Sequence, residues 1–418
     1  VLALLALPGM ALADHGDSEE AATPYVVVFK PGVDSISATA KRERALGFRA
    51  QLRYTTALSG FSARLAEWQA GVLRRDPSVD YLAPDIRTAA AHSTSLVPGE
   101  VAPTGVARIG AAGPTFAQGD AGRAVAVLDT GIDLKNADLD AAAGVNCVSP
   151  SLPPQDDNGH GTHVAGVIGA RNAGSGVVGV APGTRLYAVK VLDKRKTGTL
   201  SMLLCGIDWV ARNAAALQIQ VANMSIGATG TNDNACGAVS KQAMHQAICR
   251  ATAAGVTFVA SAGNSKVAFT KTVPAAYPEV MTATAMSDSN GRAGGGGPSF
   301  ACKSGERDDQ YATYSNYAAT AAELAHTIAA PGTCILSTRI GGGTATMYGT
   351  SSAAPHVAGA VAHCLAGPCQ SQAPADVIRT LRAEAARVAT TANGFAGDPL
   401  RPISSTKGFG HLVALPWL

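Results

Sequence analysis

The chain has 418 residues, which is long for one ordinary domain and favours two folded units. Apolar residues make up 47% of it and charged residues only 15%, a composition typical of a globular protein with a large core. The formal net charge of +3 gives no reason to expect nucleic acid or an anionic surface as a partner.

Residues 1–13 are apolar but form too short a run to span a membrane as a helix. They are typical of the apolar part of a secretory signal whose cleavage motif includes Ala11 and Ala13. The basic leader is absent, so we expect a truncated signal peptide here and an exported, extracellular protein. The sequence contains no other 18-residue apolar run without charge, so we expect no membrane anchor.

Residues 14–91 form a separate region, polar at first and then alternating between strand and helix patterns. The order is strand, helix, strand, strand, helix, strand, which is that of a small α+β ferredoxin-like unit. On the second helix, Trp68 and Val72 lie one turn apart. The predicted strands are 25–29, about 50–55, 60–65 and 79–82, and the predicted helices are about 35–46 and 67–75.

Residues 86–104 are typical of a linker, and strands alternate with helices after them. This alternation predicts an α/β fold with a doubly wound, mostly parallel sheet covered by helices on both sides. Functional groups of such sheets gather at the carboxyl ends of strands, and Asp129, Ser225 and Asn264 each lie just after one. The predicted strands are 124–128, 186–191, 221–224, 256–260 and 280–284, and the predicted helices are 163–170, about 200–213, 238–254, 352–365 and 373–386.

Residues 349–359 read Gly-Thr-Ser-Ser-Ala-Ala-Pro-His-Val-Ala-Gly, so Ser351 opens a helix made of small residues. Its hydroxyl has no bulky neighbour and lies at the positive end of a helix dipole, beside free backbone N–H groups. This arrangement suits a nucleophile whose attack creates a negative oxygen. A buried helix start rich in glycine and alanine explains the segment equally well when it is taken alone.

Two upstream segments favour catalysis. Asp129 ends an apolar strand, and His160 precedes an apolar helix of small residues. Aspartate, histidine and serine are the orienting group, the base and the attacking group of a serine hydrolase, and their order here is the subtilisin order. With these residues, the chain resembles the subtilase family of serine proteases from about residue 103 to about residue 387. The region before it resembles a subtilase propeptide.

The resemblance implies a role for each motif residue. Ser351 would be the nucleophile, His160 the general base and Asp129 the group that orients the imidazole. Asn264 would donate its side-chain N–H to the oxyanion. We expect an open S1 pocket, strand-like substrate binding and broad endopeptidase specificity because the flanking residues are small. The expected substrate-binding residues are Ser225, Ile226 and Gly227 on one wall and Ser261, Ala262 and Gly263 on the other.

The resemblance also implies domain roles. We expect residues 1–13 to be the signal, residues 14–91 an intramolecular chaperone and inhibitor, and residues 92–418 the peptidase. Aligning Tyr81–Asp85 with the end of a subtilase propeptide places the junction near Thr88–Ala91, before His92. The expected partners are therefore protein or peptide substrates and the chain's own propeptide, and the expected enzyme is a self-processing monomer.

The expected chemistry needs no cofactor, but subtilases often hold a structural calcium ion. Asp138 matches one family ligand, and the loop 171–177 has the glycines that turn carbonyl groups toward a hard cation. Ala173, however, lies where the family has an asparagine ligand, and Asn172 is one residue away. His163 follows His160 by three residues, but no third metal ligand is evident, and the family places a structural histidine there.

Eight cysteines, all at or after Cys147, agree with disulfides in an exported chain. The expected pairs are Cys236 with Cys249 and Cys364 with Cys369, and the other four cysteines leave three possible connectivities.

Two other functions compete with a secreted endopeptidase. The first is an inactive subtilase fold that serves as a binding or structural protein, and the complete set Asp129, His160, Ser351 and Asn264 counts against it. The second is another serine hydrolase such as an esterase. The GxSxG elbow of α/β-hydrolases is missing around Ser351, which counts against that design.

Overall fold

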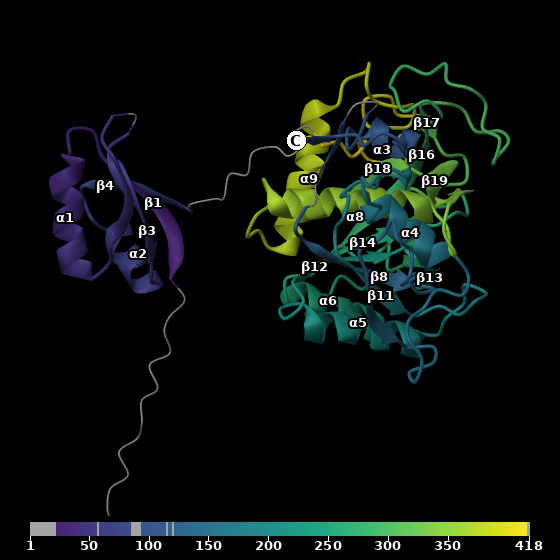
Figure 1. Cartoon of the computed structure of the whole chain (residues 1–418), viewed down its shortest axis with the longest axis horizontal. Helices are drawn as coiled ribbons and strands as arrows, with labels where there is room; N and C mark the ends of the chain where they lie inside the picture. Colours follow the sequence, from purple (N-terminus) through teal and green to yellow (C-terminus); the bar gives the residue numbers. More distant parts are fainter. Residues whose placement is uncertain (1–21, 57, 85–92, 114–115, 119–120, 416–418) are drawn as a thin grey trace, which may run out of the picture. The chain divides into compact units, whose positions relative to one another are not determined.

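The computed structural model describes residues 22–56, 58–84, 93–113, 116–118 and 121–415. The predicted signal (1–13) and the predicted junction (88–91) lie outside these residues. The chain divides into two compact units, one ending at Thr88 and the other beginning at Ala89. Figure 1 draws both units, and each is described by itself.

The small unit is an antiparallel four-stranded sheet in the order β2-β3-β1-β4 with two helices, as the ferredoxin-like pattern predicts. Its core contains Val27, Phe29, Phe61, Leu65 and Leu73, all buried. Trp68 and Val72 are exposed instead, because Ala70 and Leu73 form the buried face of their helix. The elements are β1 (Thr23–Phe29), α1 (Ser35–Leu46), β2 (Ala50–Tyr54), β3 (Gly60–Leu65), α2 (Glu67–Arg74) and β4 (Val79–Pro84).

The large unit is built on an eight-stranded sheet in the order β17-β16-β14-β12-β8-β11-β9, with β18 also paired to β16. All strand pairs in it are parallel except β16 with β17. The doubly wound, mostly parallel α/β sheet is therefore confirmed. Its strands are β8 (Ala124–Asp129), β9 (Ala141–Asn146), β11 (Leu186–Lys190), β12 (Ile219–Met224), β14 (Thr257–Ser261), β16 (Val280–Ser287), β17 (Gln310–Tyr311) and β18 (Thr327–Pro331).

Helices cover both faces of this sheet (Figure 1). Strand β8 shows why: Val125 and Val127 belong to the core under α4 and α8, whereas Ala126 and Leu128 belong to the core under α5 and α6. A strand buried on both faces is apolar at every position, as β8 is. The helices are α3 (Thr104–Arg108), α4 (His160–Gly169), α5 (Leu200–Asn213), α6 (Ala243–Ala253), α7 (Ala321–Leu324), α8 (Thr350–Ala366), α9 (Pro374–Val388) and the 3₁₀ turn η1 (Phe269–Lys271).

Four short two-stranded sheets support the loops around the main sheet. They pair β5 (Ser93–Ser95) with β7 (Phe116–Gln118), β6 (Glu100–Val101) with β10 (Gly176–Val177), β13 (Ala228–Thr229) with β15 (Thr272–Val273), and β19 (Ile335–Thr338) with β20 (Thr344–Met347).

Four disulfides link the large unit. Both expected pairs, Cys236–Cys249 and Cys364–Cys369, are confirmed. Cys147 pairs with Cys205 and Cys302 with Cys334, which is one of the three connectivities that the sequence left open. Across the described part of the chain, every helix is too short or too polar to pass through a bilayer.

Candidate active site

Asp129 and His160 come from two neighbouring elements and meet at the carboxyl edge of the sheet. Asp129 is the last residue of β8 and is fully buried, while His160 is the first residue of α4. The Nδ1 atom of His160 lies 2.7 Å from Oδ1 of Asp129. Burial of the ring opposes its protonation, but the charge and hydrogen bond of Asp129 outweigh burial, so the pKa of His160 is raised.

Asp156 holds the first turn of α4 in place. This buried carboxylate accepts hydrogen bonds from the backbone N–H groups of Gly159 and Thr162 at 2.9 Å, and from the hydroxyl of Thr162 at 2.6 Å. It also accepts the hydroxyl of Thr130, at 2.8 Å, directly after Asp129. The carboxylate therefore fixes the end of β8 relative to the helix that begins with His160.

Lys190 is a second support that the sequence analysis missed. It ends β11, opposite Asp129 in the parallel pairing of β11 with β8, and it is buried. Its Nζ donates to the carbonyl oxygens of Thr130 at 2.6 Å and Leu192 at 3.0 Å, and it pairs with Asp157 at 2.6 Å. This buried ammonium has three acceptors. It holds the backbone just after β8, at Thr130, and the backbone just after β11, at Leu192.

Ser351 and Asn264 lie side by side at the start of α8. The Oδ1 atom of Asn264 accepts the backbone N–H of Thr350 at 2.8 Å and its hydroxyl at 3.0 Å. Because Oδ1 of Asn264 accepts these two hydrogen bonds, the Nδ2 group of the same amide points away from them. A Cβ atom added to Gly349 would lie 2.9 Å from Oγ of Ser351 and 3.3 Å from this Nδ2, so both groups border the same small space. Only glycine leaves that space open, and its φ of 145° is one that other residues rarely adopt.

All but one of the predicted substrate-binding residues line one cleft. The cleft has a volume of about 670 Å³. His160, Asn264 and Ser351 line it together. Ser225, Ile226, Gly227, Ser261 and Gly263 also line it.

Two of these wall residues differ from the expectation in what their side chains do. Ala262 faces away from the cleft: its side chain packs in a buried apolar cluster with Phe269 and Ala275. The hydroxyl of Ser225 donates to the backbone carbonyl oxygen of Ser351 and accepts from the side chain of Asn223.

The neighbouring histidines are structural in this geometry. His163 is buried, and its Nε2 lies 2.9 Å from the carbonyl oxygen of Ile335. His356 is also buried, with Nδ1 2.8 Å from the carbonyl oxygen of Ser352. Burial is the main cause that lowers the pKa of each to about 4, so both rings are neutral at neutral pH. Neither ring belongs to a metal cluster among the described residues.

Asp138 faces a second carboxylate, Glu100, that the sequence analysis did not single out. Burial, and then the charge of Glu100, raise the pKa of Asp138 to about 6. Oδ1 of Asp138 and Oε1 of Glu100 are buried and have no hydrogen-bond partner. Two carboxylates that each have a buried oxygen without a hydrogen-bond partner are chemically suited to Ca²⁺.

The loop beside these carboxylates differs from the expectation. The backbone N–H groups of Ala173 and Gly174 point to Oε2 of Glu100, at 3.0 and 2.9 Å, where carbonyl groups were expected. Asn172 does not substitute for the family asparagine, because its side chain bonds the backbone of Ser95 and Val97.

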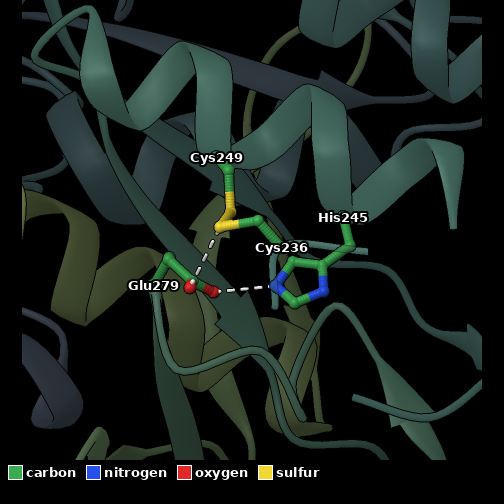
Figure 2. A group of neighbouring side chains, drawn as sticks. All are labelled: Cys236, His245, Cys249 and Glu279. Carbon is green, nitrogen blue, oxygen red and sulfur yellow. Dashed lines mark hydrogen bonds and ion pairs between the residues drawn. A yellow bond between two sulfur atoms is a disulfide. The ribbon is translucent and has the colours of Figure 1, made fainter. Parts of the chain in front are cut away.

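Figure 2 shows a different cluster of metal-type ligands, Cys236, His245, Cys249 and Glu279, whose ligand atoms lie within 4.8 Å of one another. The two cysteines form a disulfide, and thiolate is the form in which cysteine binds metals. One imidazole and one carboxylate remain, fewer than the protein ligands of a zinc site. Nε2 of His245 lies 2.9 Å from Glu279, and its ring stacks on Tyr277 with centroids 3.8 Å apart. The cluster therefore serves as a structural link between α6 and the start of β16.

Comparison with known proteins agrees with this geometry. The model of the subtilase family matches residues 120–402. The chain is 35% identical to subtilisin E of Bacillus subtilis (strain 168), over 81% of this chain and 79% of that protein. It is also 35% identical to an alkaline protease of Alkalihalobacillus alcalophilus, over 72% of this chain and 67% of that protein.

The fold has a counterpart among solved structures. A crystal structure of a cold-adapted subtilisin-like serine proteinase superimposes with a TM-score of 0.54 at 28% identity, covering 75% of this chain and 98% of that one. The sequence and structural likenesses both extend over most of this chain. The chain therefore belongs to the subtilase family and is a serine endopeptidase.

Proposed function

We propose that Asp129, His160 and Ser351 are the catalytic triad of this endopeptidase. The observation that supports the proposal best is the 2.7 Å contact between His160 and Asp129 in the cleft that Ser351 and Asn264 also line. Asp129 leaves Nε2 of His160 as the nitrogen that can accept a proton, and its charge stabilises the imidazolium that forms.

The reaction begins when Oγ of Ser351 attacks the peptide carbonyl carbon while Nε2 of His160 takes the hydroxyl proton. The tetrahedral oxyanion receives hydrogen bonds from Nδ2 of Asn264 and the backbone N–H of Ser351. His160 then returns the proton to the leaving amine, and an acyl-enzyme remains. Water, deprotonated by the same ring, hydrolyses the ester and restores Ser351. No step needs a cofactor.

The substrate adds as an extended strand between the walls 225–227 and 261–263. Main-chain hydrogen bonds would give this mode its affinity, and they depend little on the substrate's side chains. Gly227 and Gly263 keep the space between the walls free of side chains. We therefore propose cleavage within chains at many kinds of residue.

Residues 14–91 are proposed to act as chaperone and inhibitor of the peptidase, which would be made as a self-processing zymogen. The separate fold and core of residues 22–84 support a distinct role for this region. The proposed enzyme is an exported monomer. Four disulfides support an oxidising compartment.

A structural calcium ion is proposed between Asp138 and Glu100. These side chains would provide carboxylate oxygens, the ligand type that Ca²⁺ prefers, and the ion would neutralise two charges that now face each other. The ion would stabilise the fold and take no part in the reaction.

The test of the proposed triad is hydrolysis of an internally quenched peptide by the full chain. We expect cleavage that a serine-directed inhibitor stops and that Ser351→Ala lowers by several orders of magnitude. An inactive fold would cleave nothing. An esterase would turn over ester analogues but leave the peptide intact.

A further inference from the structure

The cleft beside Ser351 is positively charged. Of the described residues that line it, Lys196 and Lys271 carry a full charge, and none carries a carboxylate. We propose that this cleft selects peptides with an acidic side chain, above all glutamate at the residue just before the scissile bond (P1), with Lys271 as the residue that binds it. This proposal rests on the proposed function, because it assigns a substrate preference to the same cleft.

The space between the two walls, here called the slot, ends at the residue that a P1 side chain would meet. A Cβ atom added to Gly227 would lie 3.3 Å from Cγ2 of Thr272, and one added to Gly263 would lie 3.5 Å from the same methyl group. Thr272 therefore closes the slot that the small residues leave open. Lys271 is its direct neighbour and lines the same cleft.

Hydrogen bonds hold the backbone of Lys271 and Thr272, which form the floor of the slot. The position of the Lys271 Cα atom is therefore fixed. Thr272 pairs with Thr229 in the short sheet of β13 with β15. The carbonyl oxygen of Lys271 accepts the N–H of Gly230 at 3.1 Å. The Lys271 side chain is exposed, and its ammonium forms no ion pair with any residue in the described part of the chain. A cation on a fixed floor and without a protein partner is available to a substrate carboxylate.

Lys196 adds a second positive charge to the lining of the cleft. It is close enough to His160 for its charge to lower the pKa of that ring. The nearest carboxylate on its own loop, Asp193, is already used: it accepts the backbone N–H groups of Arg195 and Thr197 and pairs with Arg195 at 3.3 Å. Asp193 therefore does little to offset the charge of Lys196.

The two lysines have different expected effects. Lys271, beside the end of the slot, discriminates among P1 side chains. Lys196, near His160, raises the local concentration of acidic peptides over a longer range. Because the walls are made of small residues, uncharged P1 side chains still enter, and charge sets the ranking among side chains that fit.

The test uses three internally quenched peptides that differ only at P1, with Glu, Gln or Lys. The full chain is assayed at low salt, and mass spectrometry confirms the bond that is cut. We expect kcat/KM for Glu to exceed that for Gln by about fivefold, the size of a well-placed exposed ion pair, and Lys to be the poorest. The Glu preference should vanish in about 1 M salt, where the Debye length is only about 3 Å.

Variants separate Lys271 from general charge. Lys271→Met should remove most of the Glu-to-Gln preference, and Lys271→Glu should favour the Lys peptide. Lys196→Met should lower the ratio less than Lys271→Met. Lys266→Met is the matched control, because Lys266 lies five residues before Lys271 but does not line the cleft, and it should leave the ratio unchanged.

The outcomes are distinct. A wild-type Glu-to-Gln ratio of 1 or less, or a ratio that Lys271→Met does not change, overturns this inference while peptide cleavage itself stands. An equal loss of the ratio in Lys266→Met overturns the assignment to Lys271. If no peptide is cut, or if Ser351→Ala cuts equally well, the proposed triad fails instead.

Discussion

The hydroxyl of Ser225 donates a hydrogen bond of 2.8 Å to the backbone carbonyl oxygen of Ser351. This contact joins the wall that follows β12 to the first turn of α8, across 126 residues of sequence. The side chain of Asn223 donates in turn to the same hydroxyl at 3.0 Å. The backbone carbonyl group of Ser351, the proposed nucleophile, is therefore held in place by a residue of one substrate-binding wall.

Ser225→Ala tests this contact. The change keeps the wall backbone and removes both hydrogen bonds of this hydroxyl. Loss of the bond to Ser351, worth about 1 kcal/mol, should lower kcat by roughly fivefold with little change in KM. Steady-state kinetics on one peptide measures both constants. Ser151→Ala, an exposed serine outside the cleft, is the control. Wild-type kcat in Ser225→Ala would show that the contact does not position Ser351.

Asn264→Ala tests the oxyanion donor. Removing one such donor should lower kcat by roughly 10²–10³ and leave KM nearly unchanged, because the bond forms mainly in the transition state. The readout is kcat with a matched peptide, together with the thermal midpoint to confirm folding. Asn264→Asp keeps the acceptor for Thr350 but loses the donor, so it should be as inactive as the alanine variant. A loss confined to KM would contradict the role.

The pH dependence of kcat/KM tests the His160–Asp129 pair. His160 must be neutral to accept the proton, and its pKa is raised, so the acidic limb of kcat/KM should have its midpoint above the ordinary histidine value of 6.5. Asp129→Asn removes the charge that raises this pKa, so the acidic limb should move to lower pH, at an activity reduced about 10⁴-fold. Lys196→Met should move it to higher pH, because the lysine charge lowers the pKa. Shifts in the same direction would contradict this electrostatic assignment.

Self-processing predicts a difference between the active chain and Ser351→Ala. The active chain should cut itself at or within a few residues of Ala91. Ser351→Ala should accumulate with residues 14–91 still attached, because the chain would lack the nucleophile that removes them. Intact-mass measurement after expression in a protease-free host gives the answer. Identical trimming of the variant would mean that another protease performs the cut.

The calcium site predicts ion-dependent stability. In full-length Ser351→Ala, which cannot digest itself, added Ca²⁺ should raise the thermal midpoint with concentration. Asp138→Asn and Glu100→Gln should abolish this rise. Asp140→Asn is the control, because Asp140 pairs with Arg171 and Arg185. A midpoint that calcium does not move would leave the site without an ion.

The same site predicts how stability changes with pH when calcium is absent. The folded-state pKa of Asp138, about 6, lies above its ordinary value of 3.8, so the folded chain binds the proton more tightly. Its contribution to stability is complete below pH 3.8 and is lost as pH rises through about 6. Asp138→Asn should remove this dependence, and denaturant unfolding at several pH values measures it.

The sequence by itself determined most of the strands and helices of the main sheet and which residue types occur in the site. The apolar run before Asp129 predicted a buried strand, and helix 200–213 was predicted with the bounds that the structure has. These features depend on local patterns, because the order of apolar and polar residues in a short segment is enough to indicate a strand or a helix. Strands β9 and β18 were missed, because Ala141–Asn146 and Thr327–Pro331 are rich in alanine and become strands only beside a neighbouring strand. Helix α4 begins three residues before its predicted start, because Gly159 gives no side-chain cap and Asp156 holds the first turn.

The tertiary structure alone decided which distant groups meet. In the sequence, Lys190 is only one residue of the predicted strand 186–191, and nothing there indicates a role at the site. The pairing of β11 with β8 places it beside Asp129. Glu100 belongs to no recognisable sequence motif. The pairing of β6 with β10 brings it near Asp138. The charge of the cleft likewise depends on Lys196 and Lys271, which lie 75 residues apart in the sequence. Local patterns encode strands and helices, but contacts between elements arise from the packing of the whole chain, which no short segment specifies.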